Sequence, residues 1–452
     1  MASKLKIPRI LMFSPGFAPY SFSENLVSSK LALAMLARGW DVAVISAKDP
    51  GPTYETHWTH PWLPLRRVTC EISCAQLPPG IRQMQRVLHT LLVGHPLPGV
   101  RWARRAYLYA CKLHQNKPFD LVISRSISDA AHLPALAFVR RAGVPWIANW
   151  NDPPSYLFPP PYQLSASRSQ RLVWRRYFRE AAGLADFNTF PCTRLFQALR
   201  QELGLDTTDQ QRVRIVPHLG LVNYTPPPRK EDEVFRLCHA GNLAAARNPE
   251  NLLLALRRFV DKEPPGCPIE LEILGVEEVG LVNMVAHLGL GGYIKIIGPC
   301  SYLQTLERLA ASTVPVLVEA ACPEGIFLPS KLVDYLQVRR PILAVSPKPG
   351  TLDDLVREHG GGLVADVRSV DEIEKALRTL YRAWCNKSLD SYFSQKFYDR
   401  FRPESVLDAF EGMLNELDVM QDRIGMRSQS VVRSHVPDGN FKAPKKKRSL
   451  IA

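Results

Sequence analysis

Four residues have the types and places expected of a site that binds phosphates and hydroxyl groups. Lys331 and Asp334 stand three residues apart in a segment with helical periodicity, so they share one face of the expected helix. A lysine near a helix start suits phosphate oxygens, and a carboxylate one turn later suits ribose hydroxyls. Arg247 precedes another expected helix, and Gly241 follows a strand-like run, where a glycine lets the backbone approach a ligand closely.

Asp152 is the candidate for acid–base chemistry in the first half of the chain. It follows an expected strand over residues 145–149, and ligands of open parallel sheets bind at such strand ends. There it would orient or deprotonate an acceptor hydroxyl. The equally weighted alternative is an Asx turn before Pro153.

Strand-like and helix-like segments alternate along most of the chain. Such alternation indicates parallel strand pairs joined by right-handed crossovers. Residues 226–233 open with three prolines and form a polar linker between two such series. We therefore predict an α/β fold of two Rossmann-like, doubly wound parallel-sheet domains facing across a cleft. The expected domains span residues 1–222 and 223–400, followed by a helix over 401–420 that returns toward the first domain, and a basic disordered tail over 421–452.

Composition limits the class of protein. The chain has 452 residues, of which 46% are hydrophobic and 22% charged, the balance of a folded protein. No apolar run approaches the roughly 20 residues that a transmembrane helix needs, and the apolar run near the N-terminus is too short for a signal peptide. Nine cysteines without CxxC or zinc-type spacing argue against a disulfide framework or a structural metal. The expected compartment is the cytoplasm.

Positive charge is concentrated in the first half of the chain. Residues 1–222 carry a net charge of +14, residues 223–420 carry −6, and residues 421–452 carry +6. Residues 82–109 interleave five arginines with apolar side chains, a pattern typical of a helix on an anionic membrane, and residues 158–162 add an apolar loop. We therefore predict peripheral attachment to the cytoplasmic face of the membrane. The alternative is an ordinary solvated surface, and no nucleic-acid partner is expected, because no recognition motif is present.

Several segments resemble, in the right order, the GT-B-fold glycosyltransferases of family 4. The most specific is PSKLVDYLQVRRPILA at residues 329–344, which is similar to the PSKxxEYLxxGxPI signature of that family. The loop AGNL at residues 240–243 resembles the opening of its nucleotide-binding domain, and PWIANWNDP at residues 145–153 resembles its PWIADxRDPW segment. The resemblance covers about residues 7–415.

The resemblance implies a retaining transferase of hexosyl or N-acetylhexosaminyl type, with neither metal nor cofactor. Its donor would be a nucleotide-sugar and its acceptor a cell-envelope polysaccharide or lipid-linked glycan. The implied donor-binding residues are Gly16, Gly241, Asn242, Arg247, Lys331 and Asp334. The family places a further acid eight residues before the position of Asp334, where Ile326 stands. Glu324 is the nearest carboxylate, so it is assigned a catalytic role together with Asp152.

Two other functions stay open on the sequence. A sugar-nucleotide epimerase shares the two Rossmann halves, but it needs carboxylates and a histidine around the sugar. A non-catalytic nucleotide-sugar-binding protein of the same fold would account for departures from the family pattern, such as Asn242 where an arginine is frequent. Binding without turnover would distinguish the second of these from an enzyme.

Overall fold

The computed structural model places most of the chain. The described residues are 7–20, 22–48, 57–73, 78–81, 83–84, 87–88, 99–126, 129–163, 166–205, 211–228, 233–243, 246–263, 268–276 and 279–432, the last fifteen of them by backbone only. Arg82 and Arg86, residues 229–232 of the expected linker and most of the basic tail lie outside this set. Residues up to Ala409 form one compact unit and those from Phe410 onward a second, and each is described by itself.

The first domain is built on a parallel sheet. Among the described residues, seven strands pair in the order β3-β2-β1-β4-β5-β6-β7, and every pairing is parallel. The strands are β1 (Arg9–Phe13), β2 (Asp41–Ala47), β3 (Thr69–Ile72), β4 (Leu121–Arg125), β5 (Trp146–Asn149), β6 (Phe187–Phe190) and β7 (Val213–Ile215). The helices are α1 (Ser23–Ala37), α3 (Val100–Asn116), α4 (Leu133–Ala142), α5 (Arg168–Leu184) and α6 (Thr193–Leu203), with short 3₁₀ turns η1 (Leu63–Arg67) and η2 (Ser155–Leu157).

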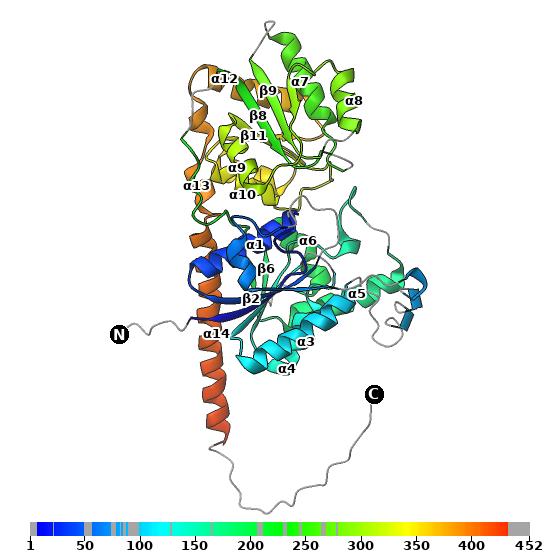
Figure 1. The fold of residues 1–452 in the computed structure, drawn as a ribbon, viewed down its shortest axis with the longest axis vertical. Helices are drawn as coiled ribbons and strands as arrows, with labels where there is room; N and C mark the ends of the chain where they lie inside the picture. Colours follow the sequence, from blue (N-terminus) through cyan, green and yellow to red (C-terminus); the bar gives the residue numbers. More distant parts are fainter. Residues whose placement is uncertain are drawn as a thin grey trace, which may run out of the picture. The chain divides into compact units, whose positions relative to one another are not determined.

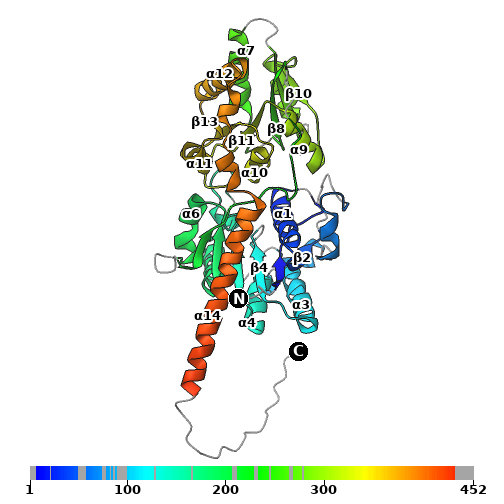
Figure 2. The same cartoon turned by 90° about the vertical axis from the view of Figure 1, so that its left-hand side faces the viewer.

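The second domain repeats this architecture. Six described strands pair in parallel in the order β10-β9-β8-β11-β12-β13. They are β8 (Phe235–Ala240), β9 (Ile269–Leu274), β10 (Ile294–Ile296), β11 (Val314–Val318), β12 (Ile342–Ser346) and β13 (Gly362–Asp366). The helices are α7 (Glu250–Lys262), α8 (Val279–His287), α9 (Tyr302–Ala311), α10 (Ser330–Gln337), α11 (Thr351–His359) and α12 (Val370–Cys385). In both views α12 lies beside α7 (Figures 1 and 2).

Three further elements complete the described chain. They are the turn η4 (Leu389–Tyr392) and helices α13 (Gln395–Asp399) and α14 (Pro403–Val432). The helix expected over residues 401–420 corresponds to the first part of α14. None of the described helices combines the length and apolarity that crossing a membrane requires.

The central strands are mostly apolar and are buried over their whole length. All residues of β4, β11 and β12 are buried, as expected for parallel strands covered by helices on both faces. The strand order reverses between β1 and β4 in the first sheet and between β8 and β11 in the second. Open α/β sheets bind ligands outside the carboxyl ends of the strands at such reversals. The predicted fold class is therefore confirmed, and its two reversal points indicate where to look for the site.

Helix α1 has an unusual composition for a helix in a protein core. Its buried residues include Asn25, Ser28, Ser29 and Lys30. Ser29 Oγ accepts a hydrogen bond from the backbone of Ala18 at 2.8 Å, and Ser28 Oγ accepts one from the Arg125 guanidinium at 2.9 Å. Buried polar groups are stable only when they have such partners. The polar face of α1 therefore links the loop after β1 to the end of β4.

Candidate active site

Two adjoining cavities lie between the domains at the reversal points. The first, here called the carboxylate cavity, has a volume of about 270 Å³ and contains the side chains of Glu24, Asp152 and Glu319. The second, the glycine-loop cavity, has a volume of about 290 Å³ and is bounded by the loops at Gly241 and Gly275. Four residues line both cavities: Ser23, Arg247, Ser330 and Lys331. We call these four residues the shared wall.

Lys331 and Arg247 give the shared wall its charge. Lys331 is the second residue of α10 and lies directly against Gly241, where a Cβ atom would collide with its Nζ. Burial and the nearby Arg247 guanidinium lower the pKa of Lys331 to about 7. Two positive groups held this close together favour the binding of a strongly anionic group. The bound anion would raise the pKa of Lys331 again and keep its side chain protonated.

Tyr335 fixes the loop at Gly241 relative to α10. Its hydroxyl accepts a hydrogen bond from the backbone N–H of Ala240, the last residue of β8, at 2.8 Å. Gly241 then turns with φ at +114°, a conformation that side chains rarely adopt. Asn242 continues the loop, and its Oδ1 accepts a hydrogen bond from the backbone of Val276 at 3.0 Å. The strand end, the loop and the helix start are therefore held as one rigid assembly.

Three carboxyl groups from different elements meet in the carboxylate cavity. Burial raises the pKa of Glu24, against the opposing effects of Arg125 and of a hydrogen bond from Asn151. Burial and then the negative charge of Glu24 raise the pKa of Asp152 well above its ordinary value. Burial likewise raises the pKa of Glu319 to about 7. The cavity therefore gathers carboxyl groups whose pKa values are all raised, and that of Glu319 lies near neutral pH.

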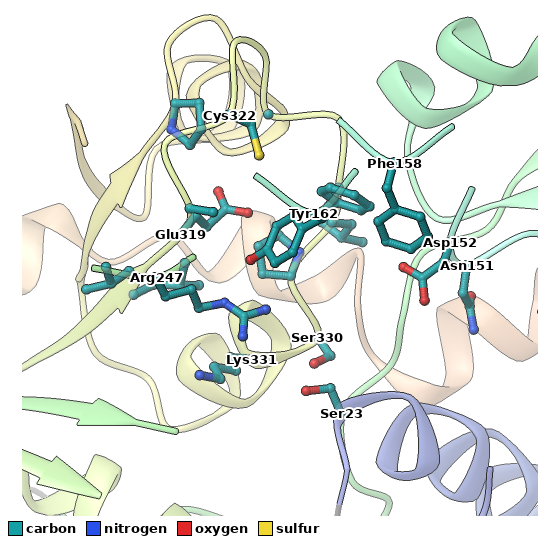
Figure 3. A pocket seen from close by; sticks show the side chains of 18 of the residues that line it. Ser23, Asn151, Asp152, Phe158, Tyr162, Arg247, Glu319, Cys322, Ser330 and Lys331 are labelled. Atoms are coloured by element: carbon teal, nitrogen blue, oxygen red, sulfur yellow. The ribbon is translucent and has the colours of Figure 1, made fainter. Parts of the chain in front are cut away.

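Hydrogen bonds orient the loop that carries Asp152. Ser126, which follows β4, accepts one from the backbone N–H of Asn151 at 2.9 Å. The Asn151 amide donates in turn to Glu24 Oε2 at 3.0 Å. Figure 3 shows Asn151 and Asp152 on one side of the cavity, with Arg247, Lys331 and Glu319 on the other. The first domain thus presents acids to a space whose other side carries cations.

An aromatic cluster lines part of the carboxylate cavity. The rings of Phe158 and Phe327 lie 5.8 Å apart, and those of Tyr162 and Phe327 lie 6.2 Å apart. Arg247 lies over the Tyr162 ring at 6.0 Å. Within residues 158–162, the loop expected to add to a membrane-facing surface, Phe158 and Tyr162 pack against Phe327 of the second domain, whereas Pro160 and Pro161 are exposed.

The structure brings together most of the residues predicted to form the site. Asp152 lines the carboxylate cavity, and Arg247 and Lys331 belong to the shared wall. Three more of the predicted residues line the glycine-loop cavity. Those three are Gly241, Asn242 and Asp334. The Asn242 side chain accepts a hydrogen bond from the backbone of Val276, in the loop after β9.

Two of the predicted residues lie outside both cavities. The first is Glu324, whose carboxylate pairs with Arg194 at 2.5 Å and is 49% exposed. Glu324 is thus held in an ion pair apart from both cavities, and its catalytic role stays a prediction. The second is Gly16, whose carbonyl accepts a hydrogen bond from Ser14 at 2.7 Å within the loop after β1. The cavities are reached instead by Ser23 and Glu24 at the start of α1, the helix that follows this loop.

Sequence reasoning missed three ionisable residues near the cavities: Glu24, Lys30 and Glu319. Glu319 directly follows the apolar strand β11, so its place at a strand end was a usable signal. Glu24 occupies the first turn of α1, where an acid is common for reasons of helix stability alone. Lys30 had no local signal, because its partner is distant in the sequence.

No metal centre is evident among the residues that the structure describes. These residues contain no group of three or more His, Cys, Asp or Glu side chains placed to hold an ion. Cations at the shared wall come from Arg247 and Lys331 instead. That the protein works without a metal remains a prediction.

Comparison with known proteins gives the fold and no family. No family model matches the sequence, and no curated protein sequence matches it either. The structure is similar to sucrose-phosphate synthase from Thermosynechococcus elongatus, with a TM-score of 0.64 and 14% identity over 92% of this chain and 100% of that one. It is also similar to a glycosyltransferase from Rickettsia africae ESF-5, with a TM-score of 0.60 and 11% identity over 90% and 98% of the two chains.

A third similar structure is a UDP-N-acetylglucosamine 2-epimerase. Its TM-score is 0.54 and its identity 12%, over 91% of this chain and 97% of that one. At such low identities these similarities establish the architecture only. The chain has the two-domain GT-B fold.

Gly241 provides a stability test of the loop. A Gly241→Ala substitution places a side chain in a strained conformation and against Lys331, so we expect it to lower the free energy of unfolding by about 1–3 kcal/mol. Gly280→Ala is the matched control, because a Cβ there meets no atom within 4 Å. Chemical denaturation of both variants measures the difference, and equal stabilities would contradict the strained geometry at Gly241.

Proposed function

We propose that this protein is a glycosyltransferase that moves a sugar from a nucleotide-sugar donor to a glycan acceptor. The observation that carries the proposal is the shared wall, where Arg247 and Lys331 stand between two cavities. A nucleotide-sugar has the matching order of parts: a nucleoside, an anionic diphosphate and a sugar. The nucleoside belongs in the glycine-loop cavity, the diphosphate at the shared wall and the sugar in the carboxylate cavity.

The chemistry follows from the charges that face the bond to be broken. When the sugar leaves the diphosphate, negative charge grows on the leaving oxygen, and Arg247 and Lys331 stabilise it. Backbone N–H groups at the start of α10 add to this stabilisation. Asp152, whose pKa is raised by burial and by Glu24, accepts the proton of the acceptor hydroxyl as that oxygen attacks. Glu319 holds hydroxyl groups of the transferred sugar. The retention of configuration proposed from the family resemblance requires the acceptor oxygen to attack the anomeric carbon from the same face that the diphosphate leaves.

The proposed acceptor is a cell-envelope polysaccharide or a lipid-linked glycan. The aromatic faces of Phe158, Tyr162 and Phe327 in the carboxylate cavity suit the C–H faces of sugar rings. We further propose that the enzyme works at the cytoplasmic face of the membrane.

Incubation with sugar nucleotides tests the proposal. UDP-, GDP- and ADP-linked hexoses and N-acetylhexosamines are screened by thermal shift, since a ligand bound only by the folded protein raises the melting temperature. The stabilising compound is then offered with a glycan acceptor, and release of nucleoside diphosphate is measured. Turnover supports the proposal. Stable binding without turnover, against a broad acceptor panel, would favour a binding protein.

An epimerase is the second candidate, favoured by three carboxyl groups with raised pKa values in one cavity. Such groups suit proton transfer to and from a sugar carbon. Nuclear magnetic resonance of the sugar nucleotide without an acceptor distinguishes the two. A change in sugar configuration indicates an epimerase, whereas a transferase leaves the configuration unchanged.

Lys331 provides a direct test of donor binding. Because its ammonium group would contact the diphosphate, Lys331→Ala should weaken nucleotide-sugar binding by about 1.5–3 kcal/mol, the value of a hydrogen bond to a charged group. Calorimetry measures this loss. Lys375→Ala removes the same charge from the exposed face of α12 and should leave the affinity unchanged. Equal affinities of the two variants would refute the assignment.

Donor affinity should also depend on pH. Lys331, with a pKa lowered to about 7, is largely neutral above that value and must gain a proton to bind an anion. Affinity for the nucleoside diphosphate should therefore rise as pH falls from about 8.5 to about 6.5. Calorimetry in two buffers of different ionisation enthalpy should show proton uptake above pH 7, reduced in Lys331→Ala. Proton release in the wild type would be inconsistent with this prediction.

Activity should survive removal of divalent metal ions. Arg247 and Lys331 would supply the positive charge that a metal provides in other transferases, so EDTA should not reduce the rate of nucleoside diphosphate release. Rates measured with EDTA, and again after Mg²⁺ or Mn²⁺ is added back, check this. Activity lost with EDTA and restored by either metal would disprove metal independence.

Membrane attachment remains a proposal supported by charge. On the described part of the basic segment, Arg104 and Leu108 are exposed on α3. Such a surface should bind anionic vesicles at low salt and release them as salt rises. Sedimentation with vesicles measures this binding, and Arg104→Glu should weaken the binding more than Lys375→Glu.

Removing residues 421–452 should weaken vesicle binding without abolishing it. A tail-less protein that ignores anionic vesicles at low salt would rule out the first-domain surface.

A further inference from the structure

A buried lysine of the first domain reaches the nucleotide side of the second. Lys30 lies on α1, its side chain is 1% exposed, and its Nζ lies 2.9 Å from Asp334 Oδ1 on α10. A buried ammonium group is costly without an acidic partner. Both residues line the glycine-loop cavity. The cavity is therefore completed by a charged side chain from the opposite domain.

Asp334 is oriented by a set of donors that all reach the same oxygen. Besides Lys30, the Tyr302 hydroxyl donates to Oδ1 at 2.7 Å and the Gln337 amide donates to it at 3.1 Å. No residue that the structure describes donates a hydrogen bond to Oδ2. With Oδ1 engaged, Oδ2 is the oxygen available to a ligand hydroxyl in the cavity.

The same network reaches the chain crossing between the domains. Gln337 accepts a hydrogen bond from the backbone of Leu221 at 2.8 Å, and the neighbouring Gly220 donates to the carbonyl of Phe401 at 2.9 Å. Asp334 is thus connected to α1 through Lys30 and to the crossing segment through Gln337. A rotation of one domain away from the other would remove Lys30 from Asp334.

We propose that Lys30 is a positioning residue of the donor site: by pairing with Asp334 across the cleft, it makes recognition of the ribose depend on closure of the two domains. The inference rests on the proposed function, because it takes the ligand to be a nucleoside diphosphate. It deepens that function by assigning to the first domain a part in nucleotide recognition. In the open protein Asp334 lacks its strongest donor, and its carboxylate is free to rotate away from the ribose.

The test uses the full chain and calorimetry with UDP, ADP and GDP and their 2′-deoxyribose forms. Wild type should bind at least one ribonucleotide and prefer it to its deoxy form. Lys30→Met should weaken ribonucleotide binding about tenfold and reduce the preference to less than about twofold, the loss of one hydrogen bond to a charged group. Asp334→Asn should do the same. The double variant should lose no more than either single variant, since the two residues act as one unit.

Arg194→Met is the matched control. Arg194 joins the domains through Asp354 and Glu324, and it lines neither cavity of the donor site. Its loss should leave both affinity and ribose preference within about twofold of wild type. Circular dichroism confirms folding. If Lys30→Met is unstable because Asp334 loses its partner, Lys30→Gln, which removes the charge but keeps a shorter hydrogen-bond donor, carries the test with the same expected losses.

The outcomes separate this inference from the proposed function. If wild type binds none of the three nucleotides, the proposed function fails and this inference falls with it. If wild type binds but Lys30→Met keeps its affinity and ribose preference, the inference alone is overturned. If Arg194→Met loses ribose preference as Lys30→Met does, Lys30 acts only through general domain contact, and the positioning role is wrong.

Discussion

The site depends on a constraint of parallel sheets: all strands of such a sheet end at the same edge. Two sheets that face each other with these edges must gather the loops after their strands into one space. Here the loops after β5, β8 and β11 bring Asp152, Gly241 and Glu319 to that space. Each sheet reverses its strand order near its centre, so the loops on the two sides of that point diverge. The gap between these loops opens where the charged side chains stand.

The shared wall then decides which kind of ligand fits. Arg247 and Lys331 are close enough for Arg247 to help lower the pKa of Lys331, while Arg247 also opposes the raised pKa values of Asp152 and Glu319. A diphosphate bound at the wall would take up much of this positive charge. The carboxyl groups would then hold protons more tightly, which suits a site that handles the proton of an attacking hydroxyl.

The sequence predicted the alternation of strands and helices because buried parallel strands are apolar along their whole length, as in β11. It also predicted Arg247, Lys331 and Asp334, since their helix-start positions are local features. Contacts between distant segments leave no such local signal. Counting residues back from Asp334 by the family spacing led to Glu324, whose partner Arg194 lies in the other domain. Lys30 appeared to be an ordinary helix residue, because Asp334 is 304 positions away.

Exposure could not be predicted for residues 158–162 for the same reason. An aromatic and proline-rich loop suits a membrane surface as well as a protein cleft, and only the position of Phe327 distinguishes the two. The membrane surface stays a proposal. The fold was therefore predictable from periodicity, whereas the meeting of Glu24, Asp152 and Glu319 in one cavity required the assembled structure.

A crystal structure with a stabilising nucleotide-sugar would test the central claim most directly. The account predicts the diphosphate against Arg247 and Lys331, the nucleoside between the loops at Gly241 and Gly275, and the sugar beside Asp152 and Glu319. A nucleoside in the carboxylate cavity, or a diphosphate bound away from Arg247 and Lys331, would contradict it.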